Sequence, residues 1–169
     1  MTSFVLRAVL LGSLALPIAG AAQLPAPAPQ SYRPGLGDLM TMTVQPRHTM
    51  LGLVGREQNW VYANYELHEL EEAFERAARA WPQWRSMPVG GMINSLTKEP
   101  LAALAQAVKA ADATRFATAY RQLTVACNAC HQAANQRMIV IKVPEASPFP
   151  DQEFRPPKPR SDASRGRFV

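Results

Sequence analysis

The chain has 169 residues, with 18 Lys and Arg against 13 Asp and Glu, which gives a formal net charge of +5 at pH 7. This length suits one ordinary domain, and a hydrophobic share of 47% permits a core without covalent staples. The basic residues are spread out rather than clustered, which argues against nucleic-acid binding. No carboxylate pair, nucleophile triad or phosphate-binding loop stands out, so we do not expect an enzyme.

Residues 1–22 read as a cleavable signal peptide. Arg7 is their only charge, residues 8–18 are apolar, and the small residues 19–22 suit a cleavage site. Pro17 and the short apolar run argue against a retained membrane helix, although an uncleaved anchor is the alternative. We therefore expect export to the periplasm.

Residues 23–35 contain four prolines and are expected to form an extended linker. A first helix is expected over residues 36–57, with a kink or local break at Pro46, which lacks a backbone donor. One face of this helix repeats at spacings of three and four, through Met40, Val44, His48, Leu51 and Gly55.

A second helix is expected over residues 58–80, where an apolar stripe runs from Trp60 to Trp81. The opposite face is charged, beginning with Glu66, and is expected to be solvated. Prolines and glycines between residues 82 and 91 indicate a loop, after which Thr97 is the expected N-cap of a third helix.

Asp112 is the expected cap of a fourth helix. Its core-facing stripe, Phe116, Tyr120, Leu123, Cys127 and Cys130, has the spacing 4-3-4-3. Residues 138–169 change character again: a short β-prone run from Ile139 precedes a proline-rich, basic end. The apolar run and Phe149 could pack back on the bundle, and we expect the rest of the tail to be extended or disordered.

Residues 127–131 read Cys-Asn-Ala-Cys-His, the attachment signature of a c-type haem. Cys127 and Cys130 can form thioether bonds with the two vinyl groups of one haem, and His131 is then held at the iron as its proximal ligand. The fourth-helix stripe places the porphyrin inside the bundle. The chain has no other cysteine.

Three other interpretations of this motif remain. A Cys-x-x-C pair can be a redox disulfide, but that motif belongs beside a βαβ pattern, which is absent here. The two cysteines and a histidine could bind zinc, yet His48 and His68 are isolated and offer no second ligand cluster. The motif could also be a chance match that binds nothing.

Four helices with this motif close to the end of the last one resemble the cytochrome c′ superfamily, the class II c-type cytochromes, over residues 36–137. Residues 36–40, 47–48, 59–60 and 65–67, with 139–141 and 148–149, look like a less-studied group of exported haem proteins. The resemblance implies an all-α fold: an antiparallel four-helix bundle, often dimeric, with one covalent haem c near one end.

In that superfamily the distal residue on the first helix decides how the haem behaves. Aligning Arg47 with the superfamily's basic residue on that helix makes Leu51 the distal residue, which implies an open, five-coordinate iron. His48 lies on the same face, however, and an imidazole there could be the sixth ligand, a distal or propionate-contacting residue, or an unrelated histidine. Met40 and Val44 complete the expected distal pocket, and Met40, Met42 and Met50 are further candidate ligands.

The sequence thus predicts an exported monohaem cytochrome that transfers single electrons to or from a periplasmic or membrane-bound redox partner. The alternative is a five-coordinate haem protein that binds or senses small gases such as NO or CO. The two differ in whether a nitrogen or sulfur donor occupies the sixth position.

Overall fold

The computed structural model describes residues 32–158. The expected signal peptide, residues 1–22, and most of the expected linker, residues 23–35, lie outside the described residues. At the end of the linker, the backbone oxygen of Pro34 accepts a hydrogen bond of 2.9 Å from Trp81 Nε1. Within residues 32–158, no helix combines the length and hydropathy needed to cross a membrane.

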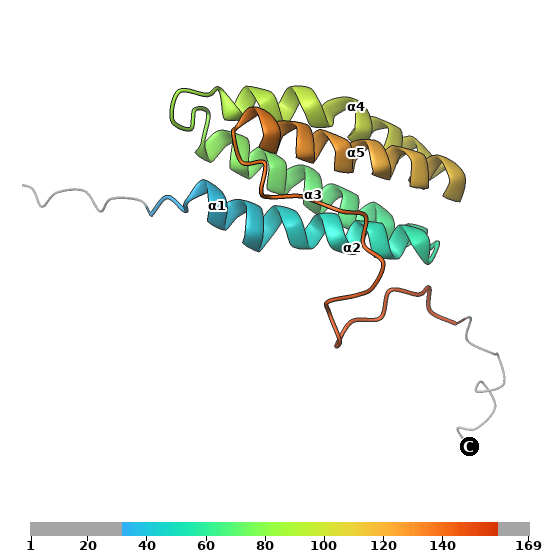
Figure 1. Ribbon diagram of the computed structural model, residues 1–169. Helices are drawn as coiled ribbons and strands as arrows, with labels where there is room; N and C mark the ends of the chain where they lie inside the picture. Colours follow the sequence, from blue (N-terminus) through green and yellow to red (C-terminus); the bar gives the residue numbers. More distant parts are fainter. Residues whose placement is uncertain (1–31, 159–169) are drawn as a thin grey trace, which may run out of the picture. The chain divides into compact units, whose positions relative to one another are not determined.

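The described residues form a helical bundle, and between residues 32 and 158 there is no strand, only an isolated bridge (Figure 1). Consecutive helices pack on each other, and α2 also contacts α5, which closes the bundle. The first three elements form one continuous helical stretch. The elements are α1 (Leu36–Leu39), the π-helix η1 (Met40–Val44), α2 (Gln45–Arg56), α3 (Trp60–Ala80), α4 (Val89–Lys109) and α5 (Ala113–Ala133).

Pro46 widens the first helical stretch instead of breaking it. The Gln45 N–H reaches back five residues to the Met40 oxygen, which is the π-helical pattern. Proline has no N–H for the usual bond and crowds the preceding turn, so one wide turn accommodates it. The expected kink or break is therefore a π turn within a continuous helix.

Helices α3 and α5 follow the expected pattern. The Asn59 side chain caps α3 by accepting from the Tyr62 N–H at 3.3 Å, and Asp112 caps α5 by accepting from the Arg115 N–H at 2.9 Å. The stripes of both helices supply much of the core, including Leu70 of α3 and Leu123 of α5, neither of which is exposed.

The expected start of the third helix at Thr97 is wrong. Helix α4 begins at Val89, directly after Pro88, and the Thr97 hydroxyl donates to the Ile93 oxygen at 2.8 Å within it. The backbone N–H groups at the start of a helix have no acceptor within the helix, so a proline, which lacks this group, is well tolerated at Pro88. Gly90 permits close packing rather than a loop, because a Cβ there would lie 2.8 Å from the Ala78 oxygen.

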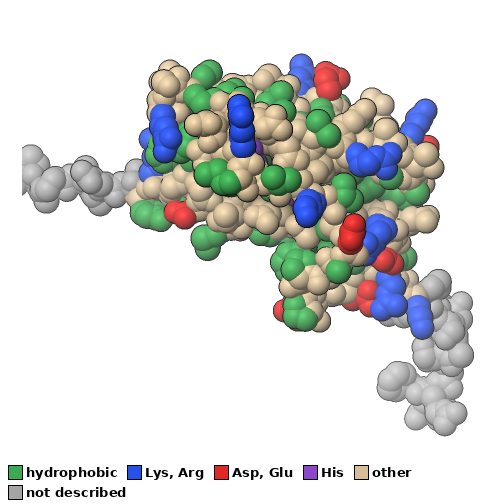
Figure 2. Space-filling model, in the orientation of Figure 1, with side chains coloured by type: hydrophobic (Ala, Val, Ile, Leu, Met, Phe, Trp, Pro, Cys, Tyr) green, Lys and Arg blue, Asp and Glu red, His purple; other side chains and the backbone are tan. Residues whose placement is uncertain are grey.

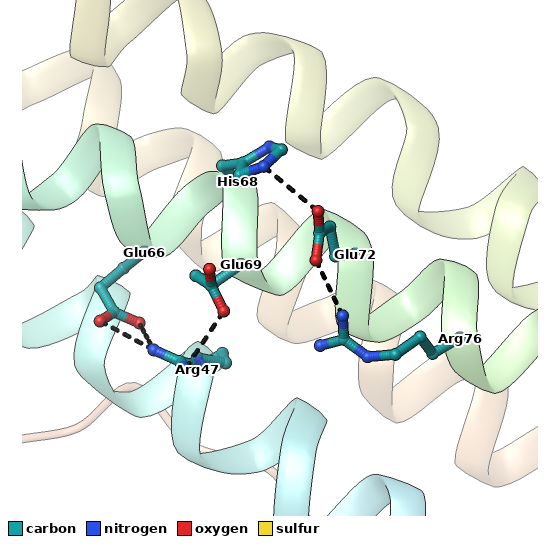
Figure 3. Close-up of polar contacts among 6 residues, drawn as sticks. All are labelled: Arg47, Glu66, His68, Glu69, Glu72 and Arg76. Carbon is teal, nitrogen blue, oxygen red and sulfur yellow. Dashed lines mark hydrogen bonds and ion pairs between the residues drawn. The ribbon is translucent and has the colours of Figure 1, made fainter.

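The charged face of α3 is not wholly solvated, contrary to expectation. Only 1% of the Glu66 side chain is exposed, and both its carboxylate oxygens lie 3.2 Å from Arg47 Nη1 (Figure 3). Arg47 Nη2 also pairs with Glu69 at 3.2 Å. Burial raises the pKa of Glu66, which the hydrogen bonds from Arg47 oppose. This buried pair joins α2 to α3.

The tail crosses the bundle in an extended conformation (Figure 1). Phe154 is buried, and Phe149 packs against the core. Asn59 Nδ2 donates to the Phe154 oxygen at 3.2 Å, and Arg56 Nη1 donates to the Glu145 oxygen at 2.7 Å. The tail is therefore anchored as far as residue 154. Phe149 packs against the core as expected, whereas the burial of Phe154 was not predicted.

Candidate functional site

One mainly apolar cavity lies between the first helical stretch, the first half of α4, the end of α5 and the tail. Its volume is about 200 Å³, and it opens to solvent through a wide mouth. Six of the residues predicted from the sequence line it together: Met40, Val44, His48, Cys127, Cys130 and His131.

The other candidates lie elsewhere. Leu51 is completely buried in the core and does not line the cavity, and Met50 is also a core residue. Met42 is 76% exposed. His68 is exposed on α3 and pairs with Glu72 at 3.3 Å (Figure 3). The structure thus places the first helix's Met40, Val44 and His48, but not Leu51, at the cavity.

Cys127 and Cys130 are free thiols on the last turns of α5. Their spacing of three places both on one helix face, toward the cavity. Burial, with a smaller contribution from Cys130, raises the pKa of Cys127 to about 12, and burial also raises the pKa of Cys130. Cysteines of redox disulfides need a lowered pKa to react as thiolates. The raised pKa values therefore do not favour a dithiol redox centre.

His131 follows directly and is oriented by the tail. Its Nδ1 lies 3.0 Å from the Ile139 oxygen. A carbonyl oxygen can only accept, so Nδ1 carries a proton, and Nε2 has no hydrogen-bond partner within residues 32–158. A metal-binding histidine commonly has this arrangement, in which the N–H of the ring nitrogen that does not bind the metal donates a hydrogen bond and so fixes the tautomer.

His48, on α2, is held by two side chains of α5. Only 3% of it is exposed. Its Nε2 lies 3.1 Å from Thr124 Oγ1, and its Nδ1 lies 3.0 Å from the Tyr120 hydroxyl oxygen. Burial lowers the pKa of His48 to about 4, so the ring is neutral near pH 7.

Two proton arrangements satisfy this cluster. In one, Nδ1–H of His48 donates to the Tyr120 oxygen, Tyr120 donates to the His48 backbone oxygen at 2.6 Å, and Thr124 donates to Nε2. In the other, Tyr120 donates to Nδ1, while Nε2–H donates to Thr124, whose hydroxyl bonds the Tyr120 backbone oxygen at 2.9 Å. Only the first leaves a lone pair on Nε2, and Thr124 occupies it.

Several site residues were not predicted from the sequence as site residues. Ile139 and Ile141 of the tail line the cavity, as do Phe74 of α3 and Ile93 of α4. Asn128, inside the Cys-x-x-Cys motif, binds the backbone of Ile141. The apolar residues carry no signal of their own, since core side chains look the same in a sequence.

The donors and the cavity fit a haem c. Two thiols on one helix face, an adjacent imidazole whose Nε2 has no hydrogen-bond partner within residues 32–158, and an apolar cavity that opens to solvent match the needs of a covalently held, iron-containing macrocycle. No three His, Cys, Asp or Glu residues in the described part of the chain form a group that could hold a bare metal ion. Comparisons with protein-family models, curated proteins and solved structures find no match to this chain.

Proposed function

We propose that this chain is an exported, periplasmic monohaem c-type cytochrome that transfers single electrons and has no catalytic turnover of its own. One observation carries this proposal. Both motif cysteines, His131 and the three predicted residues of the first helical stretch (Met40, Val44 and His48) line a single apolar cavity. The bundle is compatible with the antiparallel, cytochrome c′-like arrangement that the sequence resembles, in which a homodimer is common.

Each motif residue has a separate role. The Cys127 and Cys130 thiols would form thioether bonds with the two vinyl groups and so attach the macrocycle to α5, and the Nε2 atom of His131 would bind the iron. When bound, the haem supplies a centre that gains or loses one electron. The apolar walls keep water away, which limits reorganisation when the charge changes.

His48 is the proposed sixth ligand, and its Nε2 atom already has a hydrogen-bond partner. The tautomer with the proton on Nδ1 presents Nε2 toward a partner, and binding the iron would require Nε2 to give up its bond with Thr124. Two histidine ligands would give a lower reduction potential than histidine with methionine, because methionine raises it.

The same contact favours a second candidate function. With Nε2 retained by Thr124, the first helical stretch offers Val44 and Met40 to the distal side. If Met40 also stays unligated, the iron is five-coordinate and open to a small gas such as CO or NO. The electron carrier and the gas-binding protein thus differ in one hydrogen bond.

The partner of the electron carrier is proposed to be an acidic redox protein of the periplasm or its membrane. Residues 113–144, which hold the motif, carry four basic residues, Arg115, Arg121, Arg137 and Lys142, and no acidic one. All four are exposed. Figure 2 shows basic side chains distributed over the face that the tail crosses, with hydrophobic side chains between them and acidic ones mainly toward the lower right. Such a surface attracts an acidic partner.

An absorption spectrum of the protein, purified from a host with haem-attachment machinery, tests the proposal. Cys127→Ala with Cys130→Ala should abolish covalent haem. Low-spin bands that CO leaves unchanged, and a high-spin spectrum in His48→Ala, are expected for the electron carrier. A high-spin wild-type spectrum that shifts with CO would favour the gas-binding alternative.

His68→Ala is the matched control, because His68 is an exposed histidine away from the cavity. It should leave the spectrum unchanged. Thr124→Val removes the competitor for Nε2 and should favour the low-spin state. Wild-type protein without covalent haem would refute both functions.

A further inference from the structure

The tail turns back on α5 directly after the motif. Helix α5 ends at Ala133, and Asn135 has a φ of 56°, a left-handed conformation that asparagine tolerates. The Gln136 N–H then bonds the His131 oxygen at 2.7 Å. These turns direct residues 138–143 back beside the last turns of α5.

Asn128 binds the returning tail with both ends of its side-chain amide. Its Nδ2 donates to the Ile141 oxygen at 2.9 Å, and its Oδ1 accepts from the Ile141 N–H at 2.8 Å. Nδ2 also donates to the Thr124 oxygen at 3.1 Å, which fixes the amide to its own helix. Asn128 therefore acts toward Ile141 as a neighbouring strand would.

The same stretch of tail orients His131. In extended backbone, residues two apart present their polar groups on the same side. Ile139 is two residues before Ile141, and its oxygen accepts from His131 Nδ1 at 3.0 Å. Asn128 in turn precedes His131 by three residues on α5, about one helical turn. The two contacts are therefore successive attachments of one segment to one helix.

We propose that Asn128 is the positioning residue for His131. By holding Ile141, it keeps the Ile139 oxygen against Nδ1, which selects the tautomer with a free Nε2 and makes the imidazole a stronger donor. This inference rests on the proposed function, since it assigns His131 to haem iron. A stronger donor stabilises the oxidised iron, so the contact lowers the reduction potential.

Three variants test the role of Asn128. Asn128→Ala removes every contact of the amide, whereas Asn128→Asp keeps the acceptor for the Ile141 N–H and serves if the alanine variant fails to fold. Gln132→Ala is the control, because Gln132 is exposed beside His131 and its side chain makes no hydrogen bond within residues 32–158. The readouts are the reduction potential of the holoprotein and hydrogen exchange of the Ile141 amide.

Asn128→Ala should raise the potential and accelerate exchange at Ile141 by about tenfold or more. Asn128→Asp should raise the potential less, and Gln132→Ala should change neither. Unchanged exchange in Asn128→Ala would show that Asn128 does not hold the tail. Faster exchange with an unchanged potential would show that the tail does not tune His131. Either result overturns the proposal.

A failure of the proposed function is distinguishable from these results. If the wild-type chain carries no haem, the nitrogen NMR shifts of His131 in the full-length protein still report its tautomer. A proton on Nδ1 in the wild type, and a mixed tautomer in Asn128→Ala, would support the positioning role without haem. The same tautomer distribution in both would refute it.

Discussion

At the scale of single residues, the burial of His48 makes stability depend on pH. Its pKa is lowered from 6.5 to about 4 in the folded chain. Below pH 6.5 the His48 side chain is protonated in the unfolded chain but stays neutral in the folded chain. The free energy of unfolding therefore falls as the pH drops from 6.5 toward 4. In the protein without haem, we expect the free energy of unfolding to decrease by about 3 kcal/mol across this range.

Urea denaturation at both ends of the range measures this change. His48→Gln cannot titrate there and should lose correspondingly less stability on acidification. Equal pH dependence in the two proteins would contradict the assignment to His48. The neighbours that hold His48 could not be predicted, because Thr124 and Tyr120 lie 76 and 72 positions along the chain. The helical spacing did predict that Tyr120 faces the core.

The buried pair of Glu66 and Arg47 yields a second prediction at this scale. Arg47→Ala leaves the Glu66 carboxylate buried without its cation, and we expect the free energy of unfolding to fall by about 3 kcal/mol. Arg76→Ala is the control, since Arg76 pairs with the half-exposed Glu72 at 2.9 Å and should cost less than about 0.5 kcal/mol (Figure 3). Thermal or urea unfolding measures both variants. If Arg47→Ala and Arg76→Ala lost similar amounts of stability, the larger contribution assigned to the buried pair would be contradicted.

At the scale of helices, Gly55 lets α2 approach α5. A methyl group at Gly55 would overlap the Phe116 ring, so Gly55→Ala should destabilise the protein by about 2 kcal/mol through overpacking. Gly91→Ala in α4 meets nothing within 4 Å and should instead stabilise by about 0.5 kcal/mol. Urea denaturation of both variants checks this contrast, which would fail if Gly55→Ala were neutral.

The sequence predicts which segments are helical better than where they begin. The 3-4 stripes and the cap Asp112 are local features, and α3 and α5 match them closely. The start of α4 depends instead on a tertiary contact, because Gly90 packs against the Ala78 backbone. A glycine used for close packing and a glycine used for a turn look identical in one sequence.

In the candidate site, too, features that depend on local spacing were predicted and features that depend on tertiary contacts were not. The spacing of Cys127, Cys130 and His131 on one helix places all three at one cavity, and periodicity adds Met40 and Val44. The tail carbonyl that orients His131 could not be predicted from spacing or periodicity. It depends on a backbone atom of Ile139, and any residue at that position would supply the same oxygen.

For the whole molecule, charge differs between segments of the chain. The basic segment of residues 113–144 contrasts with α3, which carries five glutamates, among them Glu66 and Glu72. Reversing both Arg137 and Lys142 to Glu should slow electron transfer with an acidic partner by about tenfold at low salt, because the attraction between the surfaces is lost. Lys109→Glu, at the end of α4, is the control and should have a smaller effect.

Stopped-flow kinetics at increasing ionic strength provides the measurement. The wild-type rate should fall as salt is added, and the difference between wild type and the double variant should shrink. A double variant that reacts as fast as wild type would show that the partner does not dock on this segment.

Because the tail is attached both before and after residue 142, cutting it there should not release it. Asn128 holds Ile141 on one side, and Phe154 is buried on the other. Of the four lysines in the chain, Lys98 and Lys109 lie in α4 and Lys158 precedes a proline, which leaves Lys142 in extended, exposed backbone. A lysine-specific protease should therefore yield two fragments that separate in denaturing gels but travel together through gel filtration as one nicked protein.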